Sequence, residues 1–287
     1  MKSRRVFIAH GSMAAAALLT AKPFQSLAGN FKKLAGINIL EEPISIIHTA
    51  NLYSRLSPVA DRSLYNGLGG FKNTATVIAS LKKQIPNVVL LDAGNYSGAL
   101  NNFDDTTETL QLMHELGYDA VGKGKEDNDI SSEHQYIPFI KNDDKEYRLI
   151  EKGKIKIAVI NTAGFKNDMA LINDFANRLR SEHDCNVIIC LSSLGYKKTN
   201  RHDDINLAAS SKNIDIILGA GSDTFMRNPD IAKNRDGREV IINHTGYAGI
   251  VLGKIDISFD EYGNKKTIAF DNLMIGTPNN RWMSVTA

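Results

Sequence analysis

The stretch "GGFKNTATVIASLKKQIPNVVLLDAGN", residues 69–95, decides the fold. Its first part predicts an amphipathic helix over residues 69–84, because apolar side chains from Phe71 to Leu81 recur at helical spacing. Its second part, residues 87–95, predicts a buried strand that breaks at Gly94. A helix followed directly by a short apolar strand is typical of α/β proteins, in which functional side chains follow the carboxyl ends of strands.

The same alternation continues on both sides of this stretch. The predicted helices cover 104–117, 167–182 and 203–212, and the predicted strands cover 44–49, 118–124, 185–192 and 214–221, with a hairpin over 147–162. The segments 239–246, 250–260 and 266–276 predict a final run of antiparallel strands. Parallel β-α units followed by antiparallel strands predict one mixed α/β domain over residues 29–287.

The charge of the chain bears on one class of partner, the nucleic acids. The chain has 287 residues with 34 basic and 32 acidic side chains, a formal net charge of +2. Residues 1–28 contain four of the basic side chains and no acid, so the remainder carries 30 basic against 32 acidic groups, or −2. No basic stripe or long block of charge occurs. The sequence therefore predicts no nucleic-acid partner.

The amino terminus predicts export. "SRRVFI", residues 3–8, resembles a twin-arginine export signature, and a short apolar run then leads to the small-residue ending "SLA" at Ala28. We expect residues 1–28 to be a signal peptide that directs the protein to the periplasm or cell envelope. An N-terminal amphipathic helix is the alternative. The apolar run is far shorter than the ~20 residues that span a bilayer, so no membrane span is expected.

The two cysteines, Cys185 and Cys190, lie five positions apart in one predicted strand. An odd spacing places them on opposite faces of that strand and roughly 16 Å apart, which is too far for a disulfide. We expect two buried thiols rather than a redox or metal pair.

Five predicted strand ends run into loops rich in glycine or small residues. These loops are "HTANLYS" (48–54), "LDAGNYSG" (91–98), "GKGKEDND" (122–129), "CLSSLGY" (190–196) and "LGAGSDTF" (218–225). In their order along the chain and in their residues, these loops resemble those of the metallophosphoesterase (calcineurin-like) N-terminal domain of the 5′-nucleotidase family, from His48 to about Asp260. The resemblance implies a four-layer αββα sandwich with mixed sheets.

Active members of that family hold two divalent metals, which polarise a phosphate and generate the attacking hydroxide. Their loops read HTNDxH, LDAGD, GNHE, LSHLG and GGHxH or GGHxQ. By this resemblance, the expected metal-ligand positions are occupied here by Asn51, Tyr53, Asn95, Lys125, Ser193, Gly221 and Asp223. Glu126 occupies the position of the family's catalytic histidine, while Gly124 and Asp129 match the family's residues beside the ligand positions of this loop. The resemblance therefore implies a degenerate family member that lacks the metal ligands, with no metal cofactor and no assigned catalytic residue.

The replacements are electrostatically consistent with one another. Two empty metal sites would leave carboxylates facing each other, which is costly when they are partly buried. Asparagine at positions 51 and 95 removes two negative charges. We expect the ammonium group of Lys125 to take the place of a cation by bonding to Asp223, Glu126 or Asp129.

Other polar residues have weaker signals. His48 fits a structural, hydrogen-bonding histidine better than a catalytic one, and His244 fits a rim or core position. Asp127 and Asp129 resemble a short hard-cation cluster, but a solvated loop is the preferred interpretation. "GLGG", residues 67–70, lacks the lysine and hydroxyl of a phosphate loop and predicts a lead-in to a helix. No Ser-His-Asp or Cys-His signature occurs in the sequence.

Together these features predict an exported, non-catalytic protein that acts as a binding or scaffold subunit. Its partner would be a separate nucleotidase C-terminal domain, an active paralogue or a larger envelope assembly, since no nucleotide-specificity domain is expected within residues 29–287. "RWMSVTA", residues 281–287, predicts either a tail contact through Trp282 or a packed C-terminal strand.

Two alternatives remain open. The first is an active phosphomonoester or 5′-nucleotide hydrolase that uses Mn, Zn or Mg in an atypical site. That site would be built from Asn51, Asn95, Glu126, Asp127, Asp129 and Asp223. The second is a pocket that binds phosphate or nucleotide without turnover, through Lys125 and loop amides.

Overall fold

Two six-stranded sheets packed against each other form the centre of the protein. The computed structural model describes residues 43–61, 63–98, 103–124, 127, 136–140, 146–198 and 202–276. The first sheet has the order β11 (Lys265–Phe270), β10 (Val251–Phe259), β1 (Ile44–Thr49), β2 (Val88–Asp92) and β3 (Ala120–Val121), and β12 (Leu273–Met274) also pairs with β10. The second has the order β4 (Arg148–Lys152), β5 (Ile155–Asn161), β6 (Val187–Ser192), β7 (Ile216–Gly219), β9 (Glu239–His244) and β8 (Asp230–Lys233).

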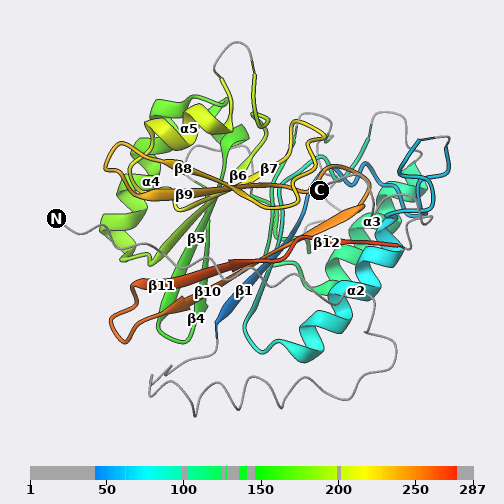
Figure 1. Cartoon of the computed structure of the whole chain (residues 1–287), viewed down its shortest axis with the longest axis horizontal. Helices are drawn as coiled ribbons and strands as arrows, with labels where there is room; N and C mark the ends of the chain where they lie inside the picture. Colours follow the sequence, from blue (N-terminus) through cyan, green and yellow to red (C-terminus); the bar gives the residue numbers. More distant parts are fainter. Residues whose placement is uncertain are drawn as a thin grey trace, which may run out of the picture.

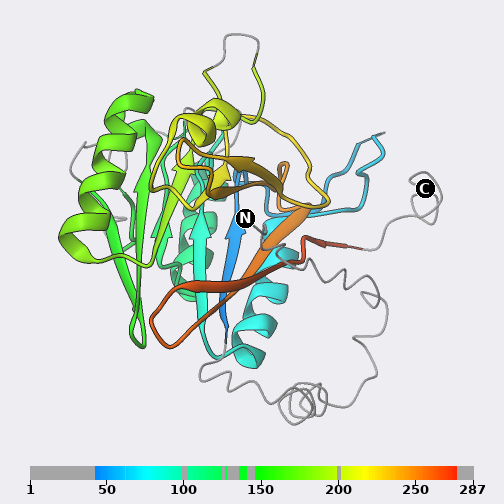
Figure 2. The same ribbon diagram turned by 60° about the vertical axis from the view of Figure 1, so that its left-hand side comes forward.

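Helices cover the outer faces of both sheets. Against the first sheet lie α2 (Phe71–Gln84) and α3 (Phe103–Leu116), and against the second lie η2 (Thr162–Phe165), α4 (Met169–His183) and α5 (Asp204–Ser210). Figure 1 shows the two groups of helices on opposite sides of the molecule, and Figure 2 shows the layers in succession from α4 to α2. This arrangement confirms the predicted αββα sandwich with mixed sheets.

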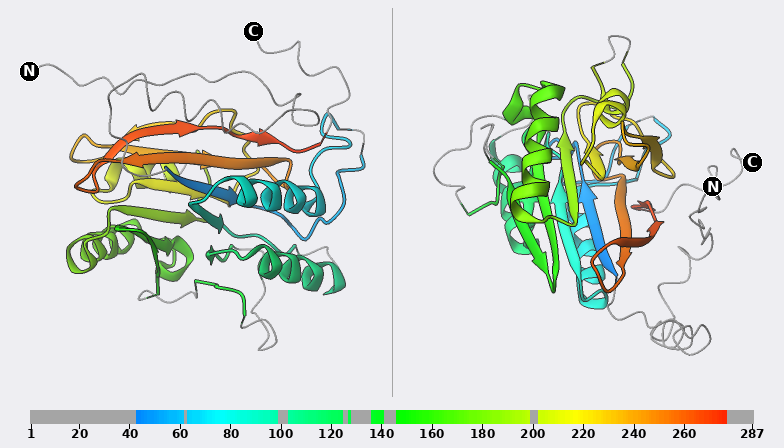
Figure 3. Two further views of the ribbon diagram at one scale, coloured as in Figure 1. Left: turned by 90° about the horizontal axis from the view of Figure 1, so that it is seen from below. Right: turned by 90° about the vertical axis from the view of Figure 1, so that its left-hand side faces the viewer.

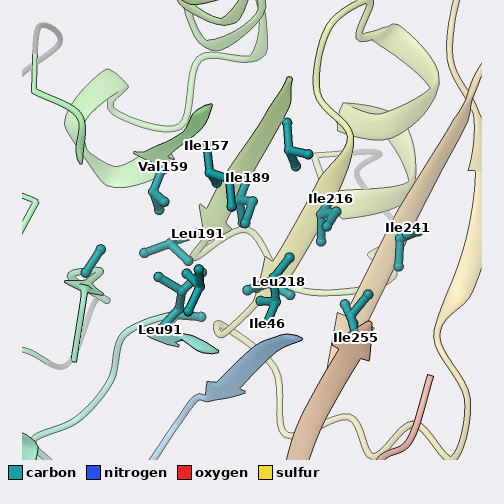
Figure 4. Packing of buried hydrophobic residues seen from close by; sticks show 14 of the residues in the cluster. Ile46, Leu91, Ile157, Val159, Ile189, Leu191, Ile216, Leu218, Ile241 and Ile255 are labelled. Carbon is teal, nitrogen blue, oxygen red and sulfur yellow. The ribbon is translucent and has the colours of Figure 1, made fainter. Parts of the chain in front are cut away.

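Three apolar clusters hold the four layers together. The central cluster lies between the sheets, and Figure 4 shows side chains from both sheets meeting there. Its members include Ile46, Leu91, Ile157, Val159, Ile189, Leu191, Ile216, Leu218, Ile241 and Ile255. Burial of branched aliphatic side chains on both faces of a strand is the reason that these strands read as continuous apolar runs.

Parallel pairing determines where the loops lie. In the first sheet β1, β2 and β3 are parallel, and in the second β5, β6, β7 and β9 are parallel. The carboxyl ends of the strands in each parallel set therefore share one edge of their sheet. Antiparallel strands lie toward the margins, and Figure 3 shows β10 and β11 side by side.

Two strand predictions were wrong. Residues 239–246 were expected in an antiparallel run, but β9 pairs parallel with β7 and antiparallel only with β8. β8 itself was not predicted, because its four residues alternate between half-buried and exposed positions and carry no apolar run. The antiparallel pairing of β10 with β11 is confirmed.

The cysteine prediction was correct in part. Cys185 and Cys190 are buried free thiols, and burial raises the pKa of both. Their expected placement on opposite faces is wrong, since both pack into the cluster between α4 and the second sheet. The reason is that β6 begins at Val187, so Cys185 precedes the strand rather than belonging to it.

The glycines before α2 lead into that helix, as predicted. Gly70 is the residue that caps the start of α2, with φ at 82°. Its N–H donates to the carbonyl of Ala248 at 2.8 Å, and a Cβ atom at Gly70 would lie 2.6 Å from the main chain of Pro58. Glycine is required here because the chain is both left-handed and tightly packed.

Candidate functional site

The loops singled out in the sequence meet where strands from both sheets end. The N–H of Asn51 donates to the carbonyl of Gly94 at 2.9 Å, which joins the loops after β1 and β2. The N–H of Ala220 donates to the carbonyl of Ser192 at 2.7 Å, which joins the loops after β7 and β6. The candidate site is therefore a shared edge, assembled from parts of the chain that are far apart in sequence.

A pair of buried amides lies at the centre of this edge. The Asn95 Nδ2 group donates to Asn51 Oδ1 at 2.8 Å, and both side chains are buried. The Asn51 Nδ2 group donates in turn to the carbonyls of Ser222, at 3.0 Å, and Gly246, at 2.9 Å. The amide pair thus ties the first sheet to two loops of the second.

Asp127 is buried beside this pair, which corrects the predicted solvated loop. Its carboxylate accepts the main-chain N–H groups of Gly124, Asn95 and Ser97 at 2.7–2.9 Å, and the Ser97 hydroxyl at 3.0 Å. Burial raises the pKa of Asp127, and these hydrogen bonds act in the opposite direction. Asp127 therefore organises the loops after β2 and β3 rather than facing solvent.

Two further positions from the sequence analysis are joined by a hydrogen bond at the surface. The Tyr53 hydroxyl donates to Asp223 Oδ1 at 3.1 Å, which links the loops after β1 and β7. Ser193, after β6, bonds instead to Asn167 Oδ1 at 3.0 Å and to the Thr162 hydroxyl at 3.2 Å. Ser193 therefore belongs to a separate hydroxyl and amide group at the same edge.

Close main-chain packing limits which side chains this edge can carry. Gly221 has φ at 68°, and a Cβ atom there would lie 2.3 Å from the carbonyl oxygen of Ser193. A Cβ atom at Gly124 would lie 1.9 Å from Asn95 Oδ1. Neither position accepts a larger residue without movement of its neighbours.

Lys125, Glu126 and Asp129 lie outside the described residues. The expectation that the Lys125 ammonium takes the place of a cation therefore stays a prediction. The same holds for residues 1–28 and for the tail 281–287, including Trp282.

Three side chains at this edge that could bind a divalent metal are engaged with protein groups. Such ions take carboxylate, imidazole, thiolate or amide-oxygen ligands, in tight sites at ~2 Å. Here Asn51 and Asn95 use their amides on each other and on the main chain, and Asp127 uses both oxygens on N–H groups. Within the described ranges, no group of three or more His, Cys, Asp or Glu side chains could hold a metal ion.

Two histidines are buried at the ends of β1 and β9. His48 Nε2 lies 2.8 Å from Asn243 Nδ2, and burial lowers the pKa of His48 from 6.5 to about 3. His244 Nε2 lies 2.8 Å from Asp204 Oδ2, and neither side chain is exposed. His48 is thus the hydrogen-bonded structural histidine that was expected, and His244 occupies the core rather than the rim.

Asp204 and Ser222 are site residues that the sequence analysis did not identify. Asp204 opens α5 beside Asp203, which caps that helix, so the pair reads as an ordinary helix start. Ser222 reads in the sequence as a retained residue beside the expected ligand position Asp223, without a local signal for a contact with an imidazole. The signal that connects them to His244 is three-dimensional, because the residues come from α5, the loop after β7 and the end of β9.

An aromatic cluster borders the edge. The rings of Tyr65 and Phe225 stack with centroids 4.7 Å apart, and Tyr247 packs against both at 5.9 Å and 5.4 Å. All three rings are partly exposed. The Phe225 ring occupies the space beside Gly246, where a Cβ atom would lie 2.0 Å from it. The cluster places an apolar surface next to the loop that holds Ser222.

The chain is similar to known proteins over most of its length, although no family model matches it. It is 24% identical over 276 residues to a snake venom 5′-nucleotidase of Gloydius brevicauda, covering 77% of this chain and 46% of the relative. It is 23% identical over 280 residues to the 5′-nucleotidase of Bos taurus, covering 78% and 48%. The chain thus spans about half the length of these curated relatives, over their N-terminal part.

Solved structures agree with the fold. A 5′-nucleotidase precursor from Thermus thermophilus superposes with a TM-score of 0.68 at 18% identity, covering 82% of this chain and 55% of that one. A calcineurin-like phosphoesterase from Bacillus subtilis gives 0.58 at 17% identity, covering 82% and 91%. None of the helices in the described ranges has the length and apolar character needed to cross a bilayer. The chain is therefore a homologue of the N-terminal part of 5′-nucleotidases, built on the calcineurin-like phosphoesterase fold.

Proposed function

We propose that this protein is an exported relative of the 5′-nucleotidases that lacks their metal-dependent phosphoesterase activity and acts by binding a protein partner. The observation that carries the proposal is the buried hydrogen bond from Asn95 Nδ2 to Asn51 Oδ1. It lies where the family resemblance implies two metal-binding aspartates. The two amides are hydrogen-bonded to each other, and Asn51 also donates to the carbonyls of Ser222 and Gly246. A cation would have to replace these bonds to enter the site.

Loss of the metal ligands is supported from several loops at once. Gly221 has no side chain to offer a metal, and a histidine there would require the Ser193 carbonyl, 2.3 Å from the Cβ position, to move. Ser193 and Tyr53 supply hydroxyl groups that are already bonded to protein atoms. Asp223 is the one carboxylate among these positions, and it accepts the Tyr53 hydroxyl.

The partner is proposed from the extent of the match. The curated relatives are about twice as long as the matched segment, which covers 46% and 48% of the two described above. We therefore propose a protein partner such as a separately encoded nucleotidase C-terminal domain, an active paralogue or an envelope assembly. Export through residues 1–28 is proposed on the twin-arginine resemblance, and relatives named for venom are consistent with it.

Metal analysis combined with activity assays tests the proposal. The purified protein is dialysed against Mn²⁺, Co²⁺ or Zn²⁺, its metal content is measured, and hydrolysis of AMP and p-nitrophenyl phosphate is followed. Bovine 5′-nucleotidase treated in the same way is the positive control. We expect less than one bound metal per chain and no turnover above buffer.

Two outcomes would contradict this expectation. Stoichiometric metal with turnover would overturn the proposal in favour of an active hydrolase with an atypical site. Calorimetric binding of AMP or phosphate without turnover would favour a nucleotide-binding pocket instead of a protein-binding surface.

A further inference from the structure

A buried carboxylate, an imidazole and a partly exposed hydroxyl form a continuous chain at the site edge. Asp204 Oδ2 lies 2.8 Å from His244 Nε2, and His244 Nδ1 lies 3.5 Å from Ser222 Oγ. Asp204 and His244 are fully buried, while Ser222 is half-buried and lies beside the exposed Asp223. The order carboxylate, imidazole, hydroxyl is that of a serine nucleophile and its base. Ser222 Oγ also lies 3.1 Å from the Thr224 hydroxyl and accepts the N–H of Tyr196 at 3.2 Å.

The two imidazole nitrogens of His244 face different partners. Nε2 faces Asp204 Oδ2, and the tautomer with its proton on Nε2 donates to that oxygen. Nδ1 then carries the lone pair and faces the Ser222 hydroxyl. Asp204 is a positioning residue, because it acts through His244, and His244 is placed to take the Ser222 proton. A separation of 3.5 Å is long for a hydrogen bond but usual for such pairs before substrate binds.

The supporting contacts hold this geometry firmly. The second oxygen of Asp204 accepts the Ser192 hydroxyl at 2.5 Å, and that hydroxyl accepts the N–H of Leu194 at 3.2 Å. The His244 ring fills the space over Gly219, where a Cβ atom would lie 2.0 Å from it. A catalytic group whose orientation is fixed by such contacts keeps that orientation before substrate binds.

The surroundings of Ser222 indicate the class of substrate. The Asp223 carboxylate is exposed at the next position and repels an anionic phosphate. The cluster of Tyr65, Phe225 and Tyr247 offers an apolar surface close by. A neutral ester with an apolar group suits both features better than a phosphate monoester does.

We propose that Ser222 is a nucleophile toward neutral carboxylic esters, with His244 as its general base. Ser222 Oγ bonds to the ester carbonyl carbon while its proton passes to His244 Nδ1. The bond from that carbon to the alcohol oxygen breaks, and the alcohol leaves with the same proton. Water then repeats the sequence on the acyl-serine, which releases the carboxylic acid and restores Ser222. No metal takes part, so this reaction differs from the metal-dependent phosphoester hydrolysis that the proposed function excludes, and it goes beyond the proposed protein-binding role.

A fluorophosphonate probe tests the nucleophile directly. Ser222 Oγ would displace fluoride from phosphorus, and peptide mass spectrometry would locate the adduct. We expect labelling of the whole protein at Ser222 in the presence of EDTA, and loss of labelling in Ser222→Ala. His244→Gln should slow labelling by about 100-fold, the usual contribution of a general base. Ser181→Ala removes an exposed hydroxyl on α4 that has no imidazole partner, and it should label like the wild type.

A kinetic measurement tests Asp204. With p-nitrophenyl acetate, Asp204→Asn should lower kcat and leave KM unchanged, whereas a mere disturbance of the loops would raise KM as well. Thermal melts identify variants that fail to fold. If Asp204→Asn does not fold, the labelling of Ser222→Ala, which changes a half-buried position, still tests the proposal. Absence of labelling in the wild type, labelling at another residue, or full labelling of folded His244→Gln would each overturn the proposal.

Discussion

Asn51 and Asn95 adopt left-handed backbone conformations, with φ at 50° and 57°. Asparagine and aspartate are the side-chain-bearing residues that tolerate this region best, so the backbone accepts either. The difference between them is the donor group. Only an amide at position 95 can donate to Asn51 Oδ1, and two carboxylates would place oxygen against oxygen in a buried setting.

Asn95→Asp should therefore destabilise the protein although it changes no volume. The substitution replaces a donated hydrogen bond by a contact between two acceptors, and such a buried loss costs about 1–3 kcal/mol. The free energy of unfolding in urea at pH 7 measures it. Asn228→Asp, at an exposed position, is the matched control and should change stability by less than about 0.5 kcal/mol. Equal stabilities would contradict the structural role given to the amide pair.

Gly221→His should not rebuild the ligand that the family resemblance implies. The Cβ atom would enter the space of the Ser193 carbonyl at 2.3 Å, in addition to the cost of a left-handed conformation. Gly237→His is a close control, since Gly237 has φ at 74° with nothing within 4 Å of its Cβ position. We expect Gly221→His to lose at least about 2 kcal/mol more than Gly237→His, measured by thermal unfolding. Similar losses would show that the loop yields to the larger side chain.

Secondary-structure elements are joined across the two sheets by one carboxylate just before β7. Asp215 forms ion pairs with Arg180 of α4 and Lys265 of β11, and it accepts the N–H of Ile188 at 2.8 Å. Its side chain is 11% exposed, so solvent screens these pairs only in part. A single residue thus links α4, β6 and a strand of the opposite sheet.

Asp215→Ala should cost much more stability than removal of a surface ion pair. It removes the shared acceptor of Lys265, Arg180 and the Ile188 N–H, although Arg180 keeps the carbonyls of Cys185 and Asn213. Such a loss costs about 2–4 kcal/mol when the groups are largely buried. Asp236→Ala breaks the exposed pair with Arg238 and should cost less than about 1 kcal/mol. Chemical denaturation of both variants compares them, and equal losses would contradict the linking role of Asp215.

Much of this organisation could be predicted from the order of residues, since local patterns determine individual elements. The start of α2 was predicted at Gly69 and lies at Phe71, and α4 was predicted over 167–182 and lies at Met169–His183. The direction of β9 was not predictable in this way, because pairing depends on which strand lies next to it in space. β8 was not predicted, because its four residues alternate between half-buried and exposed positions and carry no apolar pattern.

The site was predictable in position but not in its contacts. The resemblance located the loops of Asn51, Asn95 and Asp223, and the described residues bring these loops to one edge. The burial of Asp127 was missed because three of its four donors, the N–H of Asn95 and the N–H and hydroxyl of Ser97, lie in the distant loop after β2, and the fourth is the N–H of Gly124 in its own turn. The contacts of His244 with Asp204 and Ser222 were missed for the same physical reason: they depend on tertiary packing.

Among the described residues, Asp92 and His48 are buried ionisable groups whose effects on the stability of the whole molecule oppose each other. Burial raises the pKa of Asp92 from 3.8 to about 8, against hydrogen bonds from Thr49 and Gly94. Burial, with a smaller contribution from His244, lowers the pKa of His48 from 6.5 to about 3. Both groups are neutral in the folded protein near pH 6, because burial disfavours the charged form of each.

Linkage gives the pH dependence of folding. The folded state keeps a proton on Asp92 between pH 4 and 8 that the unfolded chain releases, so stability falls as pH rises through that range. The unfolded chain takes up a proton on His48 below pH 6.5 that the folded state refuses until about pH 3, so stability falls there as pH drops. Between about pH 4 and 6.5 the two effects offset each other.

We therefore expect a plateau of stability from about pH 4 to 6.5 and a loss of about 1–2 kcal/mol between pH 6.5 and 8. Urea denaturation at pH 5, 6.5 and 8 measures this profile. Asp92→Asn keeps the protein neutral at that position and should flatten the fall above pH 6.5. His48→Gln should remove the term that opposes Asp92, so that stability rises as pH drops from 6.5 to 4. An unchanged profile in Asp92→Asn would assign the alkaline loss to other groups, of which buried Asp127, whose pKa is raised in the same direction, is the first to substitute.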